Sequence, residues 1–165
     1  MLKGLFLSLI FVICTAMGVI KRQELKNRKD ELECMIIFTE YVKNEILYRN
    51  TPLNLIINDE RVLKLGQFFR NLSSSEKTQL YDRYDEVKTN YLNSSSLTVD
   101  DIQCLDRLFS LLGKTQEEDQ IKLLDNVINE LVKHRNDSVS DIETKGAVSV
   151  KIGIAVGLFA VMICI

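Results

Sequence analysis

The stretch AVSVKIGIAVGLFAVMICI, residues 147–165, carries a single charged residue, Lys151. A helix needs roughly twenty apolar residues to cross a hydrocarbon core about 30 Å thick. The run after Lys151 is shorter, so it spans a bilayer only if the Lys151 side chain reaches one interface and the terminal carboxylate lies at the other. The alternative is a packed terminal helix of a globular core. A similar run at the other end of the chain favours the membrane interpretation.

Residues 2–20 form that second apolar run, which only Lys3 interrupts. A short apolar run near an N-terminus is also typical of a cleaved signal peptide. Five basic residues follow within nine positions, which suits a cytoplasmic anchor better than the start of an exported protein. They are Lys21, Arg22, Lys26, Arg28 and Lys29. We therefore predict uncleaved transmembrane helices over 2–20 and 147–165, with these basic residues at an anionic lipid surface.

The distribution of charge also predicts the orientation of both helices. The five basic residues flank the inner end of the first helix, and Lys145 and Lys151 flank the inner end of the second. Because positive charge is retained on the cytoplasmic side, we expect a two-pass protein of the cell membrane with both termini outside. In this interpretation residues 21–146 form a cytoplasmic domain.

The 126 residues between the predicted spans are enough for one domain with its own core. They contain one proline and three glycines, too few for the turns of an all-β domain. The predicted fold class is therefore all-α, with about six helices, the first and last continuing as the transmembrane spans. The net charge of −2 gives no indication of a nucleic-acid partner.

The first helix is expected to continue from the span to about Asn50, because neither Pro nor Gly occurs between Ile20 and Pro52. Thr51 is predicted to cap the second helix and Pro52 to be its first residue. A third helix is expected over 60–72, with Val62, Leu65, Phe69 and Leu72 on its buried side.

Three further helix starts are predicted from pairs with capping-box spacing. These pairs are Ser73 with Glu76, Thr98 with Asp101, and Thr115 with Glu118. Helical spacing predicts a buried stripe in the first of these helices, made of Leu80, Tyr84, Val87 and Tyr91. The second is expected to end at Gly113, because a glycine adopts positive φ without strain.

Residues for catalysis or metal binding are scarce. His134 is the only histidine and lies in a charged run, so we expect it to be solvated. Three acids at 117–119 are explained by the positive end of a helix dipole more simply than by a metal site. The four cysteines have no ligand spacing and are expected as free thiols; they are Cys14, Cys34, Cys104 and Cys164. We predict no enzyme activity, no metal and no cofactor.

Gly153 and Gly157 form a GxxxG pattern in the second predicted span. This spacing permits close packing of membrane helices, here against the first span or another subunit. Glycine is also common in membrane helices without such a contact, so the alternative is a pattern with no partner.

One combination of residues is more specific than composition. Glu-Ile-Leu-Tyr-Arg-Asn-Thr-Pro-Leu, residues 45–53, closes the long first helix, and Leu112-Gly113, Gln120, Leu124 and a glycine-containing C-terminal span follow. The chain thereby resembles the stage III sporulation protein AB family of endospore-forming bacteria over essentially its whole length.

The resemblance implies a fold and a function that the spacing does not show. The cytoplasmic part of that family is similar to the cytoplasmic domain of the inner-membrane platform protein of type II secretion and type IV pilus systems, an antiparallel bundle of six helices. The family is understood as a platform in the complex that links mother cell and forespore. The implied partners are a secretion-type ATPase in the mother-cell cytoplasm and other membrane subunits of the channel. No catalytic residue is implied.

We therefore predict a non-enzymatic platform that docks an ATPase; the alternative is a stand-alone membrane regulator that binds a soluble signalling protein. Docking requires a surface away from lipid. The turns at 49–53 and 113–119 are expected to lie side by side at the end of the domain farthest from the spans, bringing Arg49 close to Glu117, Glu118 and Asp119. The predicted partner-binding residues are Arg49, Thr51, Pro52, Glu117 and Glu118.

Overall fold

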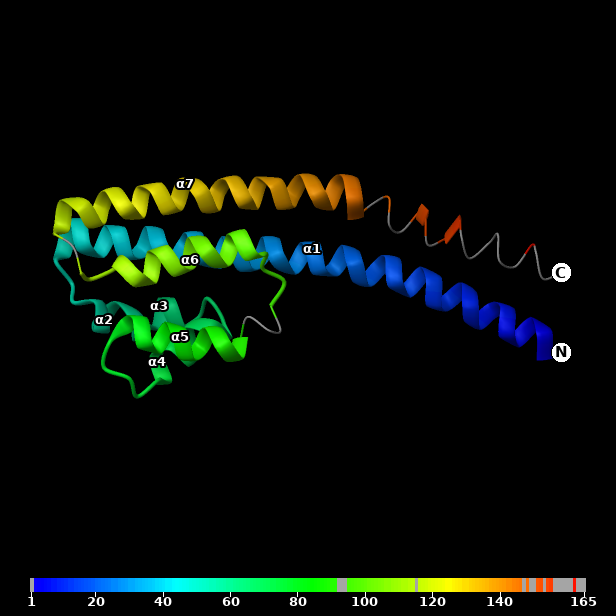
Figure 1. Cartoon of the computed structure of the whole chain (residues 1–165), viewed down its shortest axis with the longest axis horizontal. Helices are drawn as coiled ribbons and strands as arrows, with labels where there is room; N and C mark the ends of the chain where they lie inside the picture. Colours follow the sequence, from blue (N-terminus) through cyan, green and yellow to red (C-terminus); the bar gives the residue numbers. More distant parts are fainter. Residues whose placement is uncertain are drawn as a thin grey trace. The chain divides into compact units, whose positions relative to one another are not determined.

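The structure, a computed structural model, contains only helices and connecting turns in the parts of the chain that it describes (Figure 1). These parts are residues 2–91, 95–114 and 116–146 and the single positions 148, 151, 152, 154, 155 and 162; the side chains at 2–11, 14 and 15 lie outside the description. The helices are α1 (Leu2–Arg49), α2 (Leu53–Ile57), α3 (Glu60–Leu63), α4 (Gln67–Ser74), α5 (Leu80–Tyr91), α6 (Val99–Leu111), α7 (Glu117–Asp141) and the π-helical turn η1 (Ile142–Gly146). The all-α prediction is confirmed.

The chain divides into two compact units. The larger unit is Asp30–Arg135, and the smaller unit combines Met1–Lys29 with Asn136–Ile165. Helices α1 and α7 each contribute to both units.

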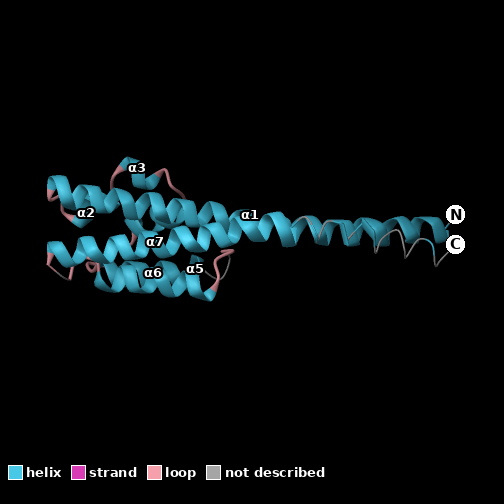
Figure 2. Cartoon of the chain, turned by 90° about the horizontal axis from the view of Figure 1, so that it is seen from above, coloured by secondary structure: helices cyan, strands magenta, loops and turns pink. Residues whose placement is uncertain are grey.

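The core of the larger unit lies between its helices. Here α7 runs antiparallel to α1, with α6 alongside (Figures 1 and 2). An ion pair of 2.5 Å between Lys43 Nζ and Asp125 Oδ1 joins α1 to α7. Aromatic rings join these helices: the Phe38 ring of α1 packs on Phe69 of α4 and stacks on Phe109 of α6, and Tyr84 of α5 also stacks on Phe109. Edge-to-face contacts join Phe68 of α4 to Phe69 and to Tyr91 of α5. The predicted stripe of α5 is confirmed, because Tyr84 and Val87 are buried and Leu80 and Tyr91 pack against the core.

The single helix predicted over 60–72 is wrong, because it is divided into α3 and α4. The Asp59 carboxylate caps α3 by accepting a hydrogen bond of 2.8 Å from the Arg61 amide. Gly66 has φ of 152° and ψ of −178°, a conformation that L-residues rarely adopt. Helix α3 ends at Leu63, and Gly66 redirects the chain so that α4 begins at Gln67.

The capping box predicted at Ser73 and Glu76 is also wrong. Ser73 and Ser74 are the last residues of α4, and the Ser73 hydroxyl donates to Asn58 Oδ1. The Ser75 hydroxyl donates to Glu86 Oε2 at 2.7 Å. These serines connect separate segments of the chain, and α5 begins only at Leu80.

Both predicted ends of α6 are confirmed. The Thr98 hydroxyl accepts from the Asp101 amide and the Asp101 carboxylate accepts from the Thr98 amide, which completes a capping box. Gly113 follows the helix with φ of 81°. The cap predicted at Thr115 lies outside the described residues, and Glu118 is in the first turn of α7.

The prediction that His134 is solvated is wrong. Its side chain is only 15% exposed, and Nδ1 lies 2.8 Å from Oδ1 of Asp101, which is fully buried. The neighbouring residues of His134 in the sequence are charged and gave no sign of its burial, because its partner is 33 positions away on α6. Asp101 thus joins the cap of α6 to the face of α7.

In the smaller unit, α1 and the end of α7 are in contact. The Ser138 hydroxyl donates to the Leu25 carbonyl at 3.2 Å, and a methyl group at Gly146 would lie 3.2 Å from Arg22 Cγ. Among the described residues, no helix has the combined length and apolar character to cross a membrane. The prediction for 147–165, including Gly153 and Gly157, falls largely outside those residues, as do most side chains of 2–15. Both spans stay predictions.

Candidate partner-binding surface

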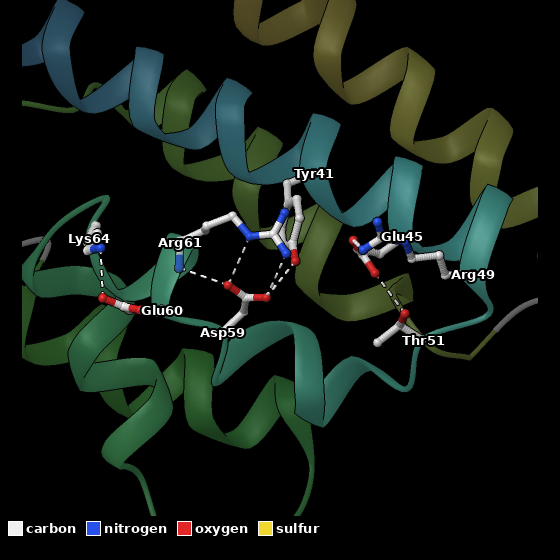
Figure 3. Close-up of polar contacts among 8 residues, drawn as sticks. All are labelled: Tyr41, Glu45, Arg49, Thr51, Asp59, Glu60, Arg61 and Lys64. Atoms are coloured by element: carbon white, nitrogen blue, oxygen red, sulfur yellow. Dashed lines mark hydrogen bonds and ion pairs between the residues drawn. The ribbon is translucent and has the colours of Figure 1, made fainter.

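One face of α1 carries polar residues that hold the segment from Thr51 to Arg61. Tyr41, Glu45 and Arg49 follow one another at intervals of four residues and therefore share this face. Figure 3 shows the two polar networks that they form, one around Glu45 and one around Asp59.

The Glu45 carboxylate is the centre of the first network. Its side chain is only 8% exposed, and it accepts from Arg49 Nη1 at 2.9 Å and from the Thr51 hydroxyl at 2.8 Å (Figure 3). The Thr51 amide donates to the Glu45 carbonyl at 3.3 Å. Asn50, between these partners, has a positive φ of 49°, which asparagine tolerates better than most residues. The end of α1 and the turn after it are thereby held in one arrangement.

The prediction that Thr51 caps the second helix is therefore wrong. Helix α2 begins at Leu53, and Pro52 precedes it with φ of −58° and ψ of 137°. The Pro52 carbonyl accepts from the amides of Leu55 and Ile56. The Thr51 hydroxyl donates to the Glu45 carboxylate, and α2 has no side-chain cap.

We expect Thr51→Val to lower the free energy of unfolding by about 1–2 kcal/mol, because the buried Glu45 carboxylate loses a donor. Valine keeps the shape of threonine, so the change measures the hydroxyl alone. Thermal unfolding followed by circular dichroism gives the difference. Thr51→Ser keeps the hydroxyl and is the matched control; equal stability of the two variants would contradict this role of Thr51.

The second network surrounds Asp59. Its carboxylate accepts from the Tyr41 hydroxyl at 2.7 Å and from the Arg61 side chain at 3.3 Å, and the Arg61 guanidinium lies 4.9 Å from the centre of the Tyr41 ring (Figure 3). Burial, and then the bond to Asp59, raise the pKa of Tyr41 to about 12. The Arg61 amide, followed by the Tyr41 hydroxyl, lowers the pKa of Asp59. At neutral pH the pair is a neutral phenol donating to a carboxylate, which anchors α3 to α1.

The turns at 49–53 and after α6 are in contact. A methyl group at Gly113 would lie 2.7 Å from Leu53 Cδ1. Beside this contact is an open groove, here called the turn groove, of about 340 Å³. It is lined by Pro52, Leu53, Asn54, Gln79, Leu80, Tyr81, Leu112, Gly113 and Lys114. The contribution of α5 to this groove was missed at the sequence level, because no local pattern places residues 79–81 beside Pro52.

Two charged residues at these turns, Arg49 and Asp119, form ion pairs within their own helices. Arg49 pairs with Glu45, and Asp119 pairs with Lys122 at 3.8 Å. Glu117 and Glu118 are exposed in the first turn of α7. In the described part of the chain, Arg49 therefore forms no ion pair with the acids of α7. Lys114 Nζ lies 5.2 Å from the centre of the Tyr81 ring at the edge of the turn groove.

Comparison with known proteins identifies the family. A family model described as stage III sporulation protein AB matches residues 3–165, which includes the turn at 49–53 and both ends of the chain. The chain belongs to the stage III sporulation protein AB family. It is therefore a sporulation protein. Neither the curated proteins nor the solved structures gave a match.

In this sporulation protein the five basic residues predicted at the membrane surface all lie on α1. Lys21 pairs with Glu24 at 2.8 Å, and Arg22 and Lys26 are exposed. Arg28 and Lys29 are half-buried and have interactions of their own. Cys34 and Cys104 are free thiols, and burial raises the pKa of the Cys104 thiol to about 12.

Proposed function

We propose that this stage III sporulation protein is a non-enzymatic membrane platform in the complex between mother cell and forespore, and that it docks a secretion-type ATPase. In this proposal residues 2–20 and 147–165 span the mother-cell membrane, and the domain between them faces the cytoplasm. The docking surface comprises Tyr48 in the last turn of α1, the turn at 49–53, the turn groove and the exposed start of α7.

The observation that carries the proposal is an exposed aromatic side chain on a fixed support. Tyr48 is 77% exposed, and the hydrogen-bonded Glu45 network holds the last turn of α1 on which it stands. Tyrosine is enriched among the residues that dominate binding energy at interfaces. A side chain on a rigid element loses little conformational freedom when a partner binds. Tyr48 therefore has the properties of an anchor residue.

The exposed acids Glu117 and Glu118 add charge near this anchor. They lie in the first turn of α7, four to five residues after Gly113, which contacts Leu53. Exposed charge at the rim of an interface mainly affects the association rate and its dependence on salt. We propose that these acids attract a basic surface of the ATPase.

Binding of the ATPase to the full chain in detergent tests the proposal. Tyr48→Ser is expected to weaken binding about tenfold or more, because an exposed anchor is removed without altering the core. The double variant Glu117→Lys/Glu118→Lys is expected to slow association about tenfold at low salt. Reversal of Arg49 is a poorer test, because Arg49 stabilises the buried Glu45 carboxylate.

The control makes the same charge change elsewhere, as Glu40→Lys/Asp85→Lys at two exposed positions of α1 and α5. It is expected to bind like the unmodified chain. Circular dichroism checks that every variant is folded. Unchanged ATPase affinity in folded Tyr48→Ser and Glu117→Lys/Glu118→Lys would exclude this docking surface. Capture of a soluble signalling protein by the same surface, without affinity for the ATPase, would favour the regulator alternative.

The orientation in the membrane has a separate test. Cys104 is a poor probe because it is buried, so a cysteine is introduced at Val99, which is 69% exposed, in a chain without other cysteines. A membrane-impermeant maleimide should label Val99→Cys only after the cells are permeabilised. Labelling in intact cells would contradict a cytoplasmic domain.

A further inference from the structure

A groove in the smaller unit lies between α1 and the end of α7. Its cavity volume is about 560 Å³, within the range of roughly 300–1,000 Å³ typical of small-molecule sites. It is lined by Val19, Arg22, Gln23, Lys26 and Lys29 of α1 and by Val139, Ile142 and Glu143 of α7 and η1. All of these residues belong to the smaller unit.

Two contacts define the walls of this groove. The Ser138 hydroxyl, fully buried, donates to the Leu25 carbonyl of α1 at 3.2 Å. Gly146, at the end of η1, lies against the Arg22 side chain, where an added methyl group would be 3.2 Å from Cγ. The absence of a side chain at Gly146 thus leaves room for the aliphatic part of Arg22. The change from α-helix to π-helix at Ile142 also occurs at the groove, and such changes are frequent at functional sites.

The lining combines positive charge with apolar surface. Arg22, Lys26 and Lys29 contribute three cations against the single carboxylate of Glu143. Val19, Val139 and Ile142 contribute the apolar part, and Val19 is 53% exposed. Arginine binds phosphate through two parallel hydrogen bonds, and lysine binds it as a point charge. A ligand that matches both features carries an anionic phosphate beside a hydrocarbon chain.

We propose that this groove binds one anionic phospholipid, with its phosphate at Arg22 and Lys26 and an acyl chain along Val19, Val139 and Ile142. This is a defined site with one occupant, which differs from a diffuse attraction of basic residues to a charged surface. Val19 lies at the end of the predicted span at 2–20, the other α1 residues of the groove directly follow that span, and those of α7 and η1 precede the span at 147–165. A lipid in the groove would therefore contact both legs of the chain. The proposal does not depend on ATPase docking.

The test measures lipid retained by the full chain in a neutral detergent, by native mass spectrometry. The probes are phosphatidylglycerol, phosphatidylcholine and inorganic phosphate. We expect one phosphatidylglycerol per chain, bound at least about tenfold more tightly than phosphatidylcholine. Inorganic phosphate, which lacks the acyl chains, should not displace it at millimolar concentration. Displacement by phosphate would overturn the assignment to a lipid.

Variants locate the site. Arg22→Gln and Lys26→Gln should each weaken phosphatidylglycerol binding about fivefold, in keeping with about 1 kcal/mol for each basic residue near an anionic lipid. Lys21→Gln is the matched control, because Lys21 pairs with Glu24 and does not line the groove. Circular dichroism verifies that each variant keeps its helix content. An equal loss in Lys21→Gln, or no loss in folded Arg22→Gln and Lys26→Gln, would show that the groove is not the site.

Discussion

Replacement of Phe109 by alanine is expected to lower the free energy of unfolding by about 3–5 kcal/mol, the usual cost of truncating a buried aromatic residue. Phe109 is fully buried on α6 and touches the aromatic residues of three other helices. Its ring stacks on Tyr84 at a centroid distance of 4.4 Å and lies 6.0 Å from Phe38 and 6.2 Å from Phe68. The variant would lose packing between α6 and each of α1, α4 and α5 at once.

Chemical denaturation followed by circular dichroism measures this difference. Leu111→Ala is the control, because Leu111 is on the same helix but 39% exposed. This control should lower the free energy of unfolding by no more than about 1 kcal/mol, since surface substitutions have small effects on stability. If both variants unfold at the same denaturant concentration, the aromatic cluster is not the centre of the core.

Asp101→Ala is expected to lower the free energy of unfolding by about 2–4 kcal/mol, because the Thr98 amide loses its buried acceptor and the capping box of α6 is lost. The Asp101 carboxylate is fully buried, accepts from the Thr98 amide at 2.8 Å and lies 2.8 Å from His134 Nδ1. Its removal ends the cap of α6 and takes away the carboxylate that lies against the His134 ring. One side chain thus supports both the start of α6 and its contact with α7.

The neighbouring acid provides the comparison. Asp100→Ala removes the same charge from the same helix turn, but Asp100 is exposed, so we expect a cost of at most about 1 kcal/mol. In a double-mutant cycle, Asp101→Ala combined with His134→Ala should cost clearly less than the sum of the two single changes. Additive costs would mean that Asp101 acts only as a cap.

The parts of the fold that could be predicted depend on signals close together in the sequence. The Thr98–Asp101 capping box and the end of α6 near Gly113 each involve residues within a few positions of one another. The stripe of α5 repeats at helical spacing, and the burial of Tyr84 follows from it. In each case the local pattern agrees with the tertiary packing, and Asp101 keeps its place in the capping box although it also contacts His134 of α7.

The errors arose where a distant partner or a backbone conformation decided the outcome. Threonine is a common N-cap residue, but the Thr51 hydroxyl donates a hydrogen bond to Glu45 on the preceding helix. His134 lies among charges, yet Asp101 draws it into the interior. The turn groove brings residues 79–81 to the Pro52 turn through tertiary packing alone. Of the candidate site, the turns themselves could be predicted, whereas the groove and the Glu45 network could not.

The conformation of Gly66 has a consequence for chirality. Its φ of 152° and ψ of −178° are the mirror image of an ordinary extended residue, and no atom lies within 4 Å of the place where an L side chain would begin. Glycine is therefore needed here because its backbone can adopt this conformation, and not because a larger side chain would lack space. A D-alanine introduced by chemical synthesis would occupy its most relaxed extended conformation there, whereas L-alanine would be strained despite the free space. The chain direction between α3 and α4 thus depends on the configuration that is allowed at the Cα of Gly66.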